Sequence, residues 1–508
     1  MALLSGIQIF FDAKNLFMAK ISIIGSGFSG LAASCFMAQA GHEVKVIEKN
    51  EGIGGRARMY KADGFTFDMG PSWYWMPDVF ENFFRQFGKS AADYYELQQL
   101  DPGFQMIFEG NEVVEIPARL EELYQTFEQI EKGSAEALRK FLKEAEFKYT
   151  VGMQDMVYKP AFSWLEYANI DVVKGMLNAN LFSSVSSYVR SYFKDERLIA
   201  LMEFPVLFLG AMANKIPALY TMMNYSALVQ GTWYPKGGMY QIVNGMKELA
   251  GSLGVDFHTG VQVDQIKIAG QLVTGLDTSM GHITADGIIA AADYNHVEQQ
   301  LLEEKYRNYD AKYWEKKTFA PSCLIYYVGV SKKLKKLLHH NLFFDADLNK
   351  HAEQIYNDPQ WPEHPLFYVC CPSKTDDTVA PDGMENIFIL VPVATGLIDT
   401  AAVRDSYFDG LIKRMESFCG ESFAAEIVYK RTYCINDFVE DYHAFKGNAY
   451  GLANTLSQTA VLKPSLRNKK VNNLFYAGQL TVPGPGVPPA LISGQVAAAE
   501  LNKYLHKK

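Results

Sequence analysis

The residue pattern with the clearest chemical meaning is a glycine-rich loop near the start of the chain, Gly25-Ser26-Gly27-Phe28-Ser29-Gly30. Its spacing allows a tight turn at the first glycine, a close approach of backbone to a pyrophosphate at the second, and close helix packing at the third. Glu48 ends the next apolar run, where its carboxylate can accept hydrogen bonds from both hydroxyls of a ribose and repel a 2′-phosphate. The pattern predicts a site for an adenine dinucleotide without that phosphate.

Two further segments have residue types that suit the same ligand. In Gly54-Gly55-Arg56, the glycines let backbone pass beneath a planar ring, and the arginine can neutralise a phosphate. Residues 478–489 combine a strand end, a rigid Gly/Pro turn and the start of a helix at Pro488. The positive end of that helix suits an electron-accepting ring that gains negative charge.

The elements around these segments predict an α/β fold. Apolar runs at 21–24 and 44–47 flank a helix of small residues, which is the order of a βαβ unit. Further strands are expected at 287–292 and 473–478, followed by a last helix from Pro488 to about Leu505. We therefore expect a discontinuous Rossmann-like nucleotide domain with an inserted mixed α+β domain.

The expected nucleotide domain comprises residues 18–105, 230–300 and 431–508. Residues 106–229 and 301–430 are expected to form the second, apolar-lined domain, because helical and strand-like segments there are rich in Phe, Tyr, Met and Leu. Residues 1–17 are interpreted as an N-terminal extension, with Met18 as an alternative start.

Length and charge restrict the class of protein. A chain of 508 residues with 48% hydrophobic residues is too long for a single core, so we expect two or more domains. A formal net charge of -9 argues against a general nucleic-acid binder. The sequence has no apolar run near the roughly 20 residues that span a bilayer, and its first residues lack the basic start of a secretory signal.

The cysteines give no sign of a metal site or of a disulfide framework. The six cysteines form no CxxC pair, and the ten histidines show no ligand spacing beside them. We therefore expect no bound metal and a reducing compartment.

Taken together, these segments resemble the carotenoid phytoene desaturases of the bacterial and fungal type, within the wider FAD-dependent amine-oxidase-like flavoproteins. The resemblance extends from Lys20 to Leu501. Its most specific stretches are Gly25–Gly30, Glu48, Gly54–Ala57, Gly64–Ser72, Tyr234–Met239 and Ala477–Gly494. It implies an enzyme that binds FAD and introduces conjugated double bonds into a C40 polyene at a membrane surface.

The resemblance also implies which residues hold the cofactor. Gly25–Gly30 and Arg56 would hold the pyrophosphate, and Glu48 the adenosine ribose. Val263 would contact the adenine end, and the last segment would contact the flavin. The complete set is Gly25, Ser26, Gly27, Phe28, Ser29, Gly30, Glu48, Lys49, Gly54, Gly55, Arg56, Val263, Gly478, Gln479, Val487 and Pro488.

The chain departs from the family pattern in its last segment. Pro485 and Pro489 stand where the family usually has glycine and alanine, and Pro489 removes one N–H donor from the flavin turn. Gln479 stands where many of these flavoproteins have an acid, and its amide can still bind the ribityl chain or a phosphate.

A long hydrocarbon offers only dispersion and area burial, so its binding site should be a tunnel of aromatic and Met side chains. Trp73–Met76, Phe204–Met212 and Tyr220–Met223 are candidates for its wall, and plain core is the alternative. Removal of hydrogen from a C–C bond needs a hydride acceptor, which FAD supplies, and a proton acceptor. Asp155, Arg190 and His443 are weak candidates for the latter, and a water molecule is another.

The leading hypothesis is stepwise conversion of 15-cis-phytoene toward lycopene. The alternatives are a desaturase of another polyene, such as a C30 diapophytoene or a later step such as 3,4-desaturation, an amine or porphyrinogen oxidase, and a non-catalytic escort of prenylated proteins. Oxygen or a quinone would take the electrons finally. A cytoplasmic protein on the inner face of the cell membrane is expected, and the basic segment Ser331–Leu338 is a candidate amphipathic contact with anionic lipid.

Overall fold

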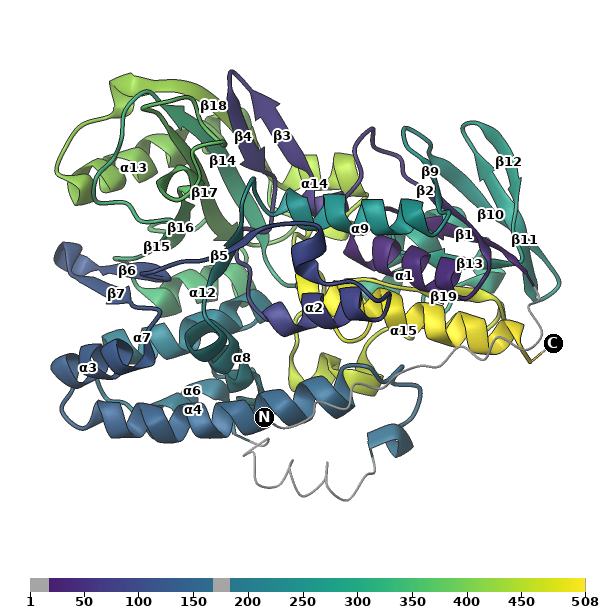
Figure 1. The fold of residues 1–508 in the computed structure, drawn as a ribbon, viewed down its shortest axis with the longest axis horizontal. Coiled ribbons are helices and arrows are strands. Elements are labelled where there is room, and N and C mark those ends of the chain that lie inside the picture. The colour runs from purple at the N-terminus through teal and green to yellow at the C-terminus, as the bar shows by residue number, and fades with distance from the viewer. Residues whose placement is uncertain (1–17, 168–182, 508) are drawn as a thin grey trace.

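A computed structural model describes residues 18–167 and 183–507, so the expected N-terminal extension at 1–17 lies outside the described residues (Figure 1). Two halves lie side by side in this view. The half on the right contains a parallel sheet, and the half on the left contains a larger mixed sheet above a group of helices.

The parallel sheet draws its strands from three separated parts of the chain. Its order is β19 (Leu474–Tyr476), β13 (Gly287–Ala290), β1 (Lys20–Ile24), β2 (Glu43–Ile47) and β9 (Asp256–His258), with every pair parallel. β1 lies in the middle, and the glycine-rich loop leaves its carboxyl end. This arrangement confirms the expected α/β class, whereas the division of the chain at residues 105, 229, 300 and 430 stays a prediction.

Both faces of the parallel sheet are covered, so successive side chains along a strand are buried on opposite faces. Strands of this kind have continuous apolar runs. Ile23 belongs to a core that the sheet shares with three helices, α1 (Phe28–Gln39), α9 (Tyr240–Ser252) and α15 (Val487–Leu505). Ile24 points to the other face, under the antiparallel strands β10 (Val263–Ala269), β11 (Leu272–Thr278) and β12 (Gly281–Thr284).

The second sheet has seven strands, all antiparallel except for the pair β15–β6. Its order is β18 (Ile427–Tyr433), β14 (Ser322–Val330), β17 (Glu385–Val393), β16 (Phe367–Cys370), β15 (His340–Phe344), β6 (Phe104–Phe108) and β7 (Val113–Ile116). In β14, Leu324 and Tyr326 pack toward helix α13 (Ala401–Cys419). Cys323 and Ile325 point to the opposite face, where the strands face the interior.

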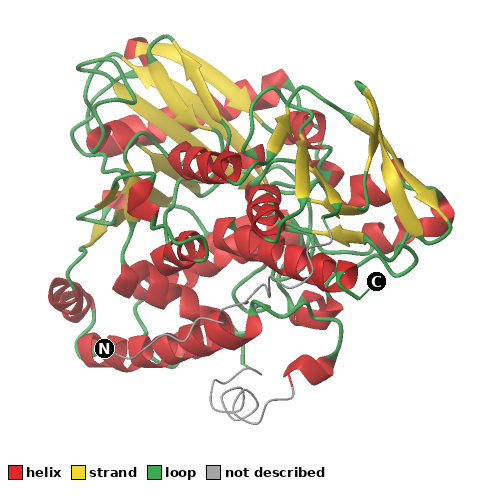
Figure 2. Cartoon of the chain, turned by 45° about the vertical axis from the view of Figure 1, so that its right-hand side comes forward, coloured by secondary structure: helices red, strands yellow, loops and turns green. Residues whose placement is uncertain are grey.

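Helices cover the interior side of this sheet (Figure 2). They are α3 (Leu120–Ile130), α4 (Ser134–Val151), α6 (Val185–Arg190), α7 (Glu196–Glu203), α8 (Met222–Tyr225) and α12 (Leu348–Tyr356). The other α-helices and strands of the described residues are α2 (Pro77–Arg85), α10 (Tyr294–His296), α11 (Ala311–Glu315), α14 (Ile435–Tyr442), β3 (Met59–Ala62), β4 (Phe65–Asp68), β5 (Leu97–Gln99) and β8 (Trp233–Pro235). Among the described helices, none combines the length and apolarity needed to cross a bilayer.

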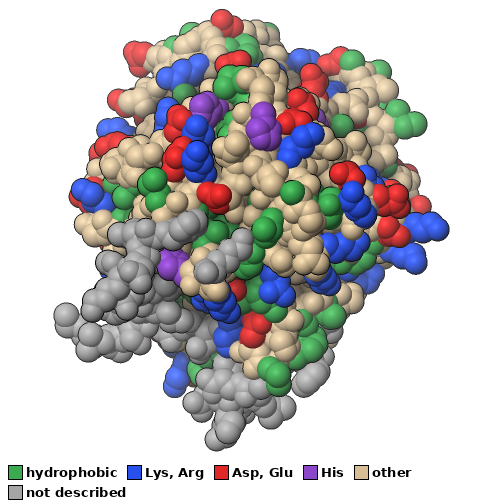
Figure 3. Space-filling view, turned by 90° about the vertical axis from the view of Figure 1, so that its right-hand side faces the viewer, with side chains coloured by type: hydrophobic (Ala, Val, Ile, Leu, Met, Phe, Trp, Pro, Cys, Tyr) green, Lys and Arg blue, Asp and Glu red, His purple; other side chains and the backbone are tan. Residues whose placement is uncertain are grey.

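The basic segment at 331–338, a candidate contact with anionic lipid, does not form a helix. It forms bends and turns, because Leu334 and Leu337 are buried in the core beside α13. Its lysines bind the protein itself: Lys332 Nζ donates to the Ser422 carbonyl at 2.6 Å, and Lys336 Nζ to that of Phe418 at 2.9 Å. On the face shown in Figure 3, basic and acidic side chains are interspersed.

Close packing of α15 against α1 should be sensitive to one added methyl group. A Cβ at Gly494 would lie 2.1 Å from the Ser29 carbonyl oxygen, so Gly494→Ala must push the two helices apart. We expect a loss of about 2 kcal/mol or more in the free energy of unfolding, measured by urea denaturation.

Gly410 provides the matched control, because it is exposed within α13 and a Cβ there would meet nothing within 4 Å. Gly410→Ala should raise stability by about 0.5–1 kcal/mol, since alanine is the better helix former. Equal stability of the two variants would contradict the proposed packing constraint.

Candidate active site

One cavity of about 580 Å³ runs between the two halves of the molecule. Its first part, the nucleotide arm, is lined by the three segments 24–29, 54–57 and 477–490. Its second part, the apolar arm, is lined by the interior face of the seven-stranded sheet and by the helices that cover it. Of the described residues predicted to hold a cofactor, all except Gly30 line this cavity.

Gly30 acts through packing instead. A Cβ at this position would lie 2.0 Å from the Gly25 carbonyl oxygen, which would prevent the loop from folding back onto the start of α1. Gly25 itself has a φ of 98° and donates its N–H to the Ile47 carbonyl at 2.8 Å. The loop is therefore held between β1 and β2, with its backbone open to the cavity.

The second glycine segment lies directly against the first. The Gly54 N–H donates to the Ser26 carbonyl at 3.0 Å, and a Cβ on Gly55 would lie 3.1 Å from the Gly27 Cα. Gly54 and Gly55 both have positive φ values, of 108° and 56°. The two segments form a cradle of bare backbone that a planar or phosphate group can approach closely.

The Glu48 carboxylate is fixed at the edge of this cradle. It is buried and accepts hydrogen bonds from the Ser26 N–H at 3.0 Å and the Ser26 hydroxyl at 2.7 Å. Its other oxygen accepts from the Asn50 N–H at 2.9 Å. These bonds set the orientation of a carboxylate that suits hydroxyl groups of a ribose.

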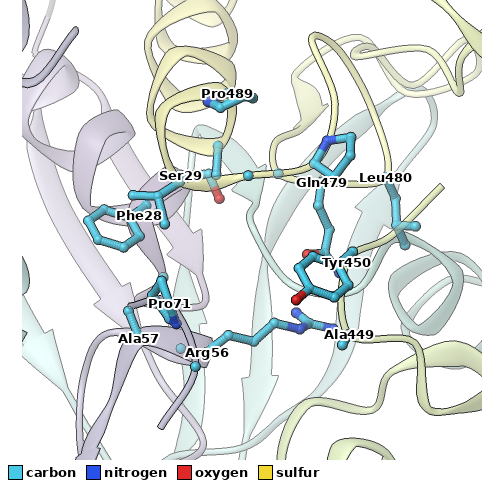
Figure 4. Close-up of a pocket in the computed structure, with 18 of the residues that line it drawn as sticks. Phe28, Ser29, Arg56, Ala57, Pro71, Ala449, Tyr450, Gln479, Leu480 and Pro489 are labelled. Carbon is cyan, nitrogen blue, oxygen red and sulfur yellow. The ribbon is translucent and has the colours of Figure 1, made fainter. Parts of the chain in front are cut away.

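Arg56 extends across the cavity toward Ala449, Tyr450 and Gln479 (Figure 4). Its guanidinium donates to the Asn448 carbonyl at 3.2 Å and lies 5.0 Å from the centre of the Tyr442 ring, and its Nε has no partner. Burial lowers the pKa of Arg56, while the charge of Asp293 opposes that change. A half-buried and incompletely paired cation of this kind fits an anionic ligand such as a pyrophosphate.

The last segment approaches the cradle from the carboxyl end of β19. Gln479 lies 3.1 Å from the Asn448 side chain, so its amide is next to Arg56. Behind the Gly/Pro turn, Lys463 is buried without a partner, and a Cβ on Gly484 would lie 3.3 Å from its Cε. Burial lowers the pKa of Lys463 to about 7. Lys463 does not line the cavity, whereas the cradle and Arg56 do, and together these two fit a ligand with a phosphate group.

The three candidate proton acceptors have different positions. His443 lines the nucleotide arm and stacks on His296 with ring centroids 4.0 Å apart. Burial lowers both pKa values, that of His296 to about 4, and the nearby Lys49 acts in the same direction. Arg190 does not line the cavity; it forms two hydrogen bonds to Glu196, at 2.8 and 2.9 Å, with its side chain 46% exposed. The Asp155 side chain lies outside the described part of the structure.

The apolar arm contains most of the expected wall residues. Trp73, Trp75 and Met76 line it. Tyr74 instead packs in the core, and its hydroxyl forms a hydrogen bond with the Tyr95 hydroxyl at 2.9 Å. The wall residues from the two later segments are Phe204, Leu207, Leu209, Tyr220, Met222 and Met223. The seven-stranded sheet contributes Cys323, Ile325, Leu342, Phe344, Tyr368 and Leu390.

A histidine in the apolar arm has both of its ring nitrogens paired. His351 lines this arm, and its Nε2 lies 2.9 Å from the Pro392 carbonyl and its Nδ1 accepts from the Leu366 N–H at 3.0 Å. Because both ring nitrogens are used and burial lowers the pKa of His351 to about 4, this residue is a poor base.

Sequence reasoning missed several residues of the nucleotide arm. Asp293 could have been found, because it comes shortly after the end of β13, following Ala291 and Ala292, at the edge where parallel strands bind ligands. Tyr442 and Asn448 carry no such signal, since only the folded chain brings them to Arg56.

Comparison with known proteins identifies the family. The chain matches the flavin containing amine oxidoreductases over residues 28–502. A carotenoid 3,4-desaturase of Haloarcula japonica is 40% identical over 484 residues, covering 95% of this chain and 97% of that protein. A zeta-carotene-forming phytoene desaturase of Myxococcus xanthus is 31% identical over 495 residues, covering 96% and 94%.

Solved structures agree with the fold. An oxidoreductase from Methanosarcina mazei superposes with a TM-score of 0.62 at 16% identity, over 94% of this chain and 99% of that one. Putrescine oxidase bound to putrescine superposes with a TM-score of 0.60 at 14% identity, over 96% and 99%. The resemblance predicted from the motifs is confirmed: the chain belongs to the flavin-containing amine oxidoreductase family and is a flavin-dependent oxidoreductase.

Proposed function

We propose that this protein is an FAD-dependent carotenoid desaturase that acts near the end of an already conjugated polyene, as in 3,4-desaturation. The observation that carries the proposal is one continuous cavity, in which a cradle for a dinucleotide continues into an arm lined by aromatic and aliphatic side chains. A flavin and a long hydrocarbon would therefore meet inside one enclosure.

The residues of the nucleotide arm fit FAD. Gly25–Gly30 and Arg56 would hold the pyrophosphate, Glu48 the adenosine ribose, and Lys49 and Val263 the adenosine end. The flavin end would contact Gly478, Gln479, Val487 and Pro488, where α15 directs its positive end into the cavity. When bound, the flavin supplies a hydride acceptor.

The protein's own contribution is to hold the polyene and to exclude water. Trp73, Phe204 and Tyr368 offer flat apolar surfaces, and a hydrocarbon gains affinity only from such contact. His443 stacks on His296 beside Lys49, at the adenosine end, so we place it with the cofactor. The proton that the substrate loses is then accepted by a weakly basic group or by a water molecule in the apolar arm.

The relatives favour the later step over the leading hypothesis. The relative named as a carotenoid 3,4-desaturase is 40% identical, against 31% for the zeta-carotene-forming phytoene desaturase, over nearly the same length. The conversion of phytoene toward lycopene therefore becomes the second candidate. C30 polyenes remain a third, since 4,4'-diapophytoene desaturases of Staphylococcus are 28–29% identical.

Association with a membrane surface would give access to such a substrate. The helical turn Trp164–Tyr167 projects from the lower edge of the molecule in Figure 1, with the Trp164 side chain 60% and the Leu165 side chain 83% exposed. Tyr167, the last residue of the turn, and Lys159, which precedes the turn, line the cavity. We place the protein on the inner face of the cell membrane, with this turn in the lipid interface and oxygen or a quinone as the final electron acceptor.

Arg56→Met should lower the FAD retained per chain roughly tenfold or more, because a charge-assisted hydrogen bond is worth about 1.5–3 kcal/mol. Glu48→Gln should have a smaller effect, since its amide keeps one acceptor. The flavin absorbance of the purified proteins measures both. Arg190→Met is the control, because that side chain is exposed and outside the cavity. Full flavin content in both site variants would refute the assignment.

Expression in a host that accumulates lycopene, and in a second host that accumulates phytoene, tests which of the two carotenoids the protein desaturates. We expect new pigments with red-shifted absorption only in the first host, because a terminal double bond extends the conjugated system. Chromatography of the extracted pigments provides the measurement. Desaturation of phytoene would restore the leading hypothesis, and unchanged pigments in both hosts would contradict a carotenoid desaturase of either kind.

The double variant Trp164→Glu/Leu165→Glu should bind anionic liposomes at least about tenfold more weakly in flotation assays, because burying one large apolar side chain is worth about 1.5–3 kcal/mol. Its flavin content should not change. Ile398→Glu is the matched control, since Ile398 is also 83% exposed but lies beyond β17. An equal loss of liposome binding in both variants would exclude a specific role of this turn in membrane association.

A further inference from the structure

Two histidines and a cysteine meet on the cavity-facing side of the seven-stranded sheet. His340 on β15 stands directly opposite Cys370 on β16 in the antiparallel register, so their side chains share one face. His339 immediately precedes β15, and its carbonyl accepts a hydrogen bond from the Cys371 N–H at 2.7 Å. Strand pairing thus brings together residues that show no ligand spacing along the sequence.

The three side chains form a compact and buried group. One ligand atom of each, an imidazole nitrogen or the thiol sulfur, lies within 4.8 Å of the others. Their exposed fractions are 3% for His339, 0% for His340 and 4% for Cys370. Ligands at about 2.0–2.3 Å from one metal ion lie roughly 3.5–4 Å from each other, so modest side-chain rotation would complete the site.

The outer hydrogen bonds of the two histidines match those of metal ligands. His339 Nδ1 lies 2.6 Å from the Thr375 hydroxyl, and His340 Nδ1 lies 2.6 Å from the Tyr368 hydroxyl. The Nε2 atoms of both rings have no hydrogen-bond partner. Metal-bound histidines are typically oriented in this way through their second nitrogen, whereas a buried nitrogen without any partner is costly.

The donor set selects the class of ion. Two imidazoles and a thiol suit soft or borderline metals, and they do not suit magnesium or calcium. The nearby carboxylates are already used: Asp68 accepts from the Met239 and Tyr240 N–H groups, and Asp376 from the Gly237 N–H. We infer that His339, His340 and Cys370 bind a d10 metal ion, Cu⁺ or Zn²⁺, with release of the thiol proton and no change of oxidation state.

Such an ion would stiffen the wall of the apolar arm. The His340 ring stacks on Trp73 with centroids 4.1 Å apart and planes 12° from parallel, and both Trp73 and Tyr368 line the cavity. The site revises the expectation of no metal that the cysteine and histidine spacing suggested. It does not depend on which substrate the enzyme takes, because the ligands lie behind the wall.

The test measures the metal content of the full-length, flavin-containing protein by plasma mass spectrometry, as purified and after titration with Zn²⁺ or, under anaerobic reducing conditions, with Cu⁺. We expect a single tightly held ion per chain. His340→Gln and Cys370→Ser should each lower its occupancy roughly tenfold or more. Cys371→Ser is the matched control, since Cys371 is equally buried but packs in the core on the other face of the sheet.

X-ray absorption spectra of the unmutated protein provide a second measurement that needs no variant. One sulfur and two imidazole neighbours around copper or zinc would support the site and would identify which ion it holds. Spectra with oxygen and nitrogen neighbours alone would overturn it. Absence of a bound ion before and after titration would also overturn it, and the flavin absorbance of the same samples shows independently whether the cofactor site is intact.

Discussion

The contact between helices α1 and α15 is the constraint on which the nucleotide half depends. A Cβ at Gly494 would lie 2.1 Å from the Ser29 carbonyl, so α15 must present bare backbone where it meets α1. This contact sets the separation of two positive helix ends, one at the glycine-rich loop and one at the Gly/Pro turn. In the proposed cofactor site, one rigid pair of helices would therefore hold both the pyrophosphate and the flavin end of the dinucleotide.

The seven-stranded sheet shows how one element serves two purposes. In β14, Leu324 and Tyr326 build the core beside α13, while Cys323 and Ile325 reach the cavity on the other face. Alternation along the strand thus makes the wall of the apolar arm part of the folded core. Its shape is fixed by packing, and a substrate that offers only apolar surface can be recognised by that shape.

The parts that sequence reasoning could predict are those in which local pattern and chemistry coincide. The glycine loop, the acidic end of β2 and the last helix follow from spacing and turn residues, and so do the fold class and the family. Pairings between distant residues could not be predicted, such as Arg56 with Asn448, His296 with His443, and His340 with Cys370. The contacts of Lys332 and Lys336 could not be predicted for the same reason, because their partners come from residues 418–426.

The order of the strands has a consequence for synthesis of the chain. The edge strand β19 and the helix α15 occupy the last residues, 474–505, yet they close the enclosure opened by Gly25–Gly30. While the ribosome is still adding this part, the first βαβ unit lacks the helix that covers it. The nucleotide half therefore cannot be completed domain by domain during translation, and its cavity closes only after residues 474–505 have been synthesised.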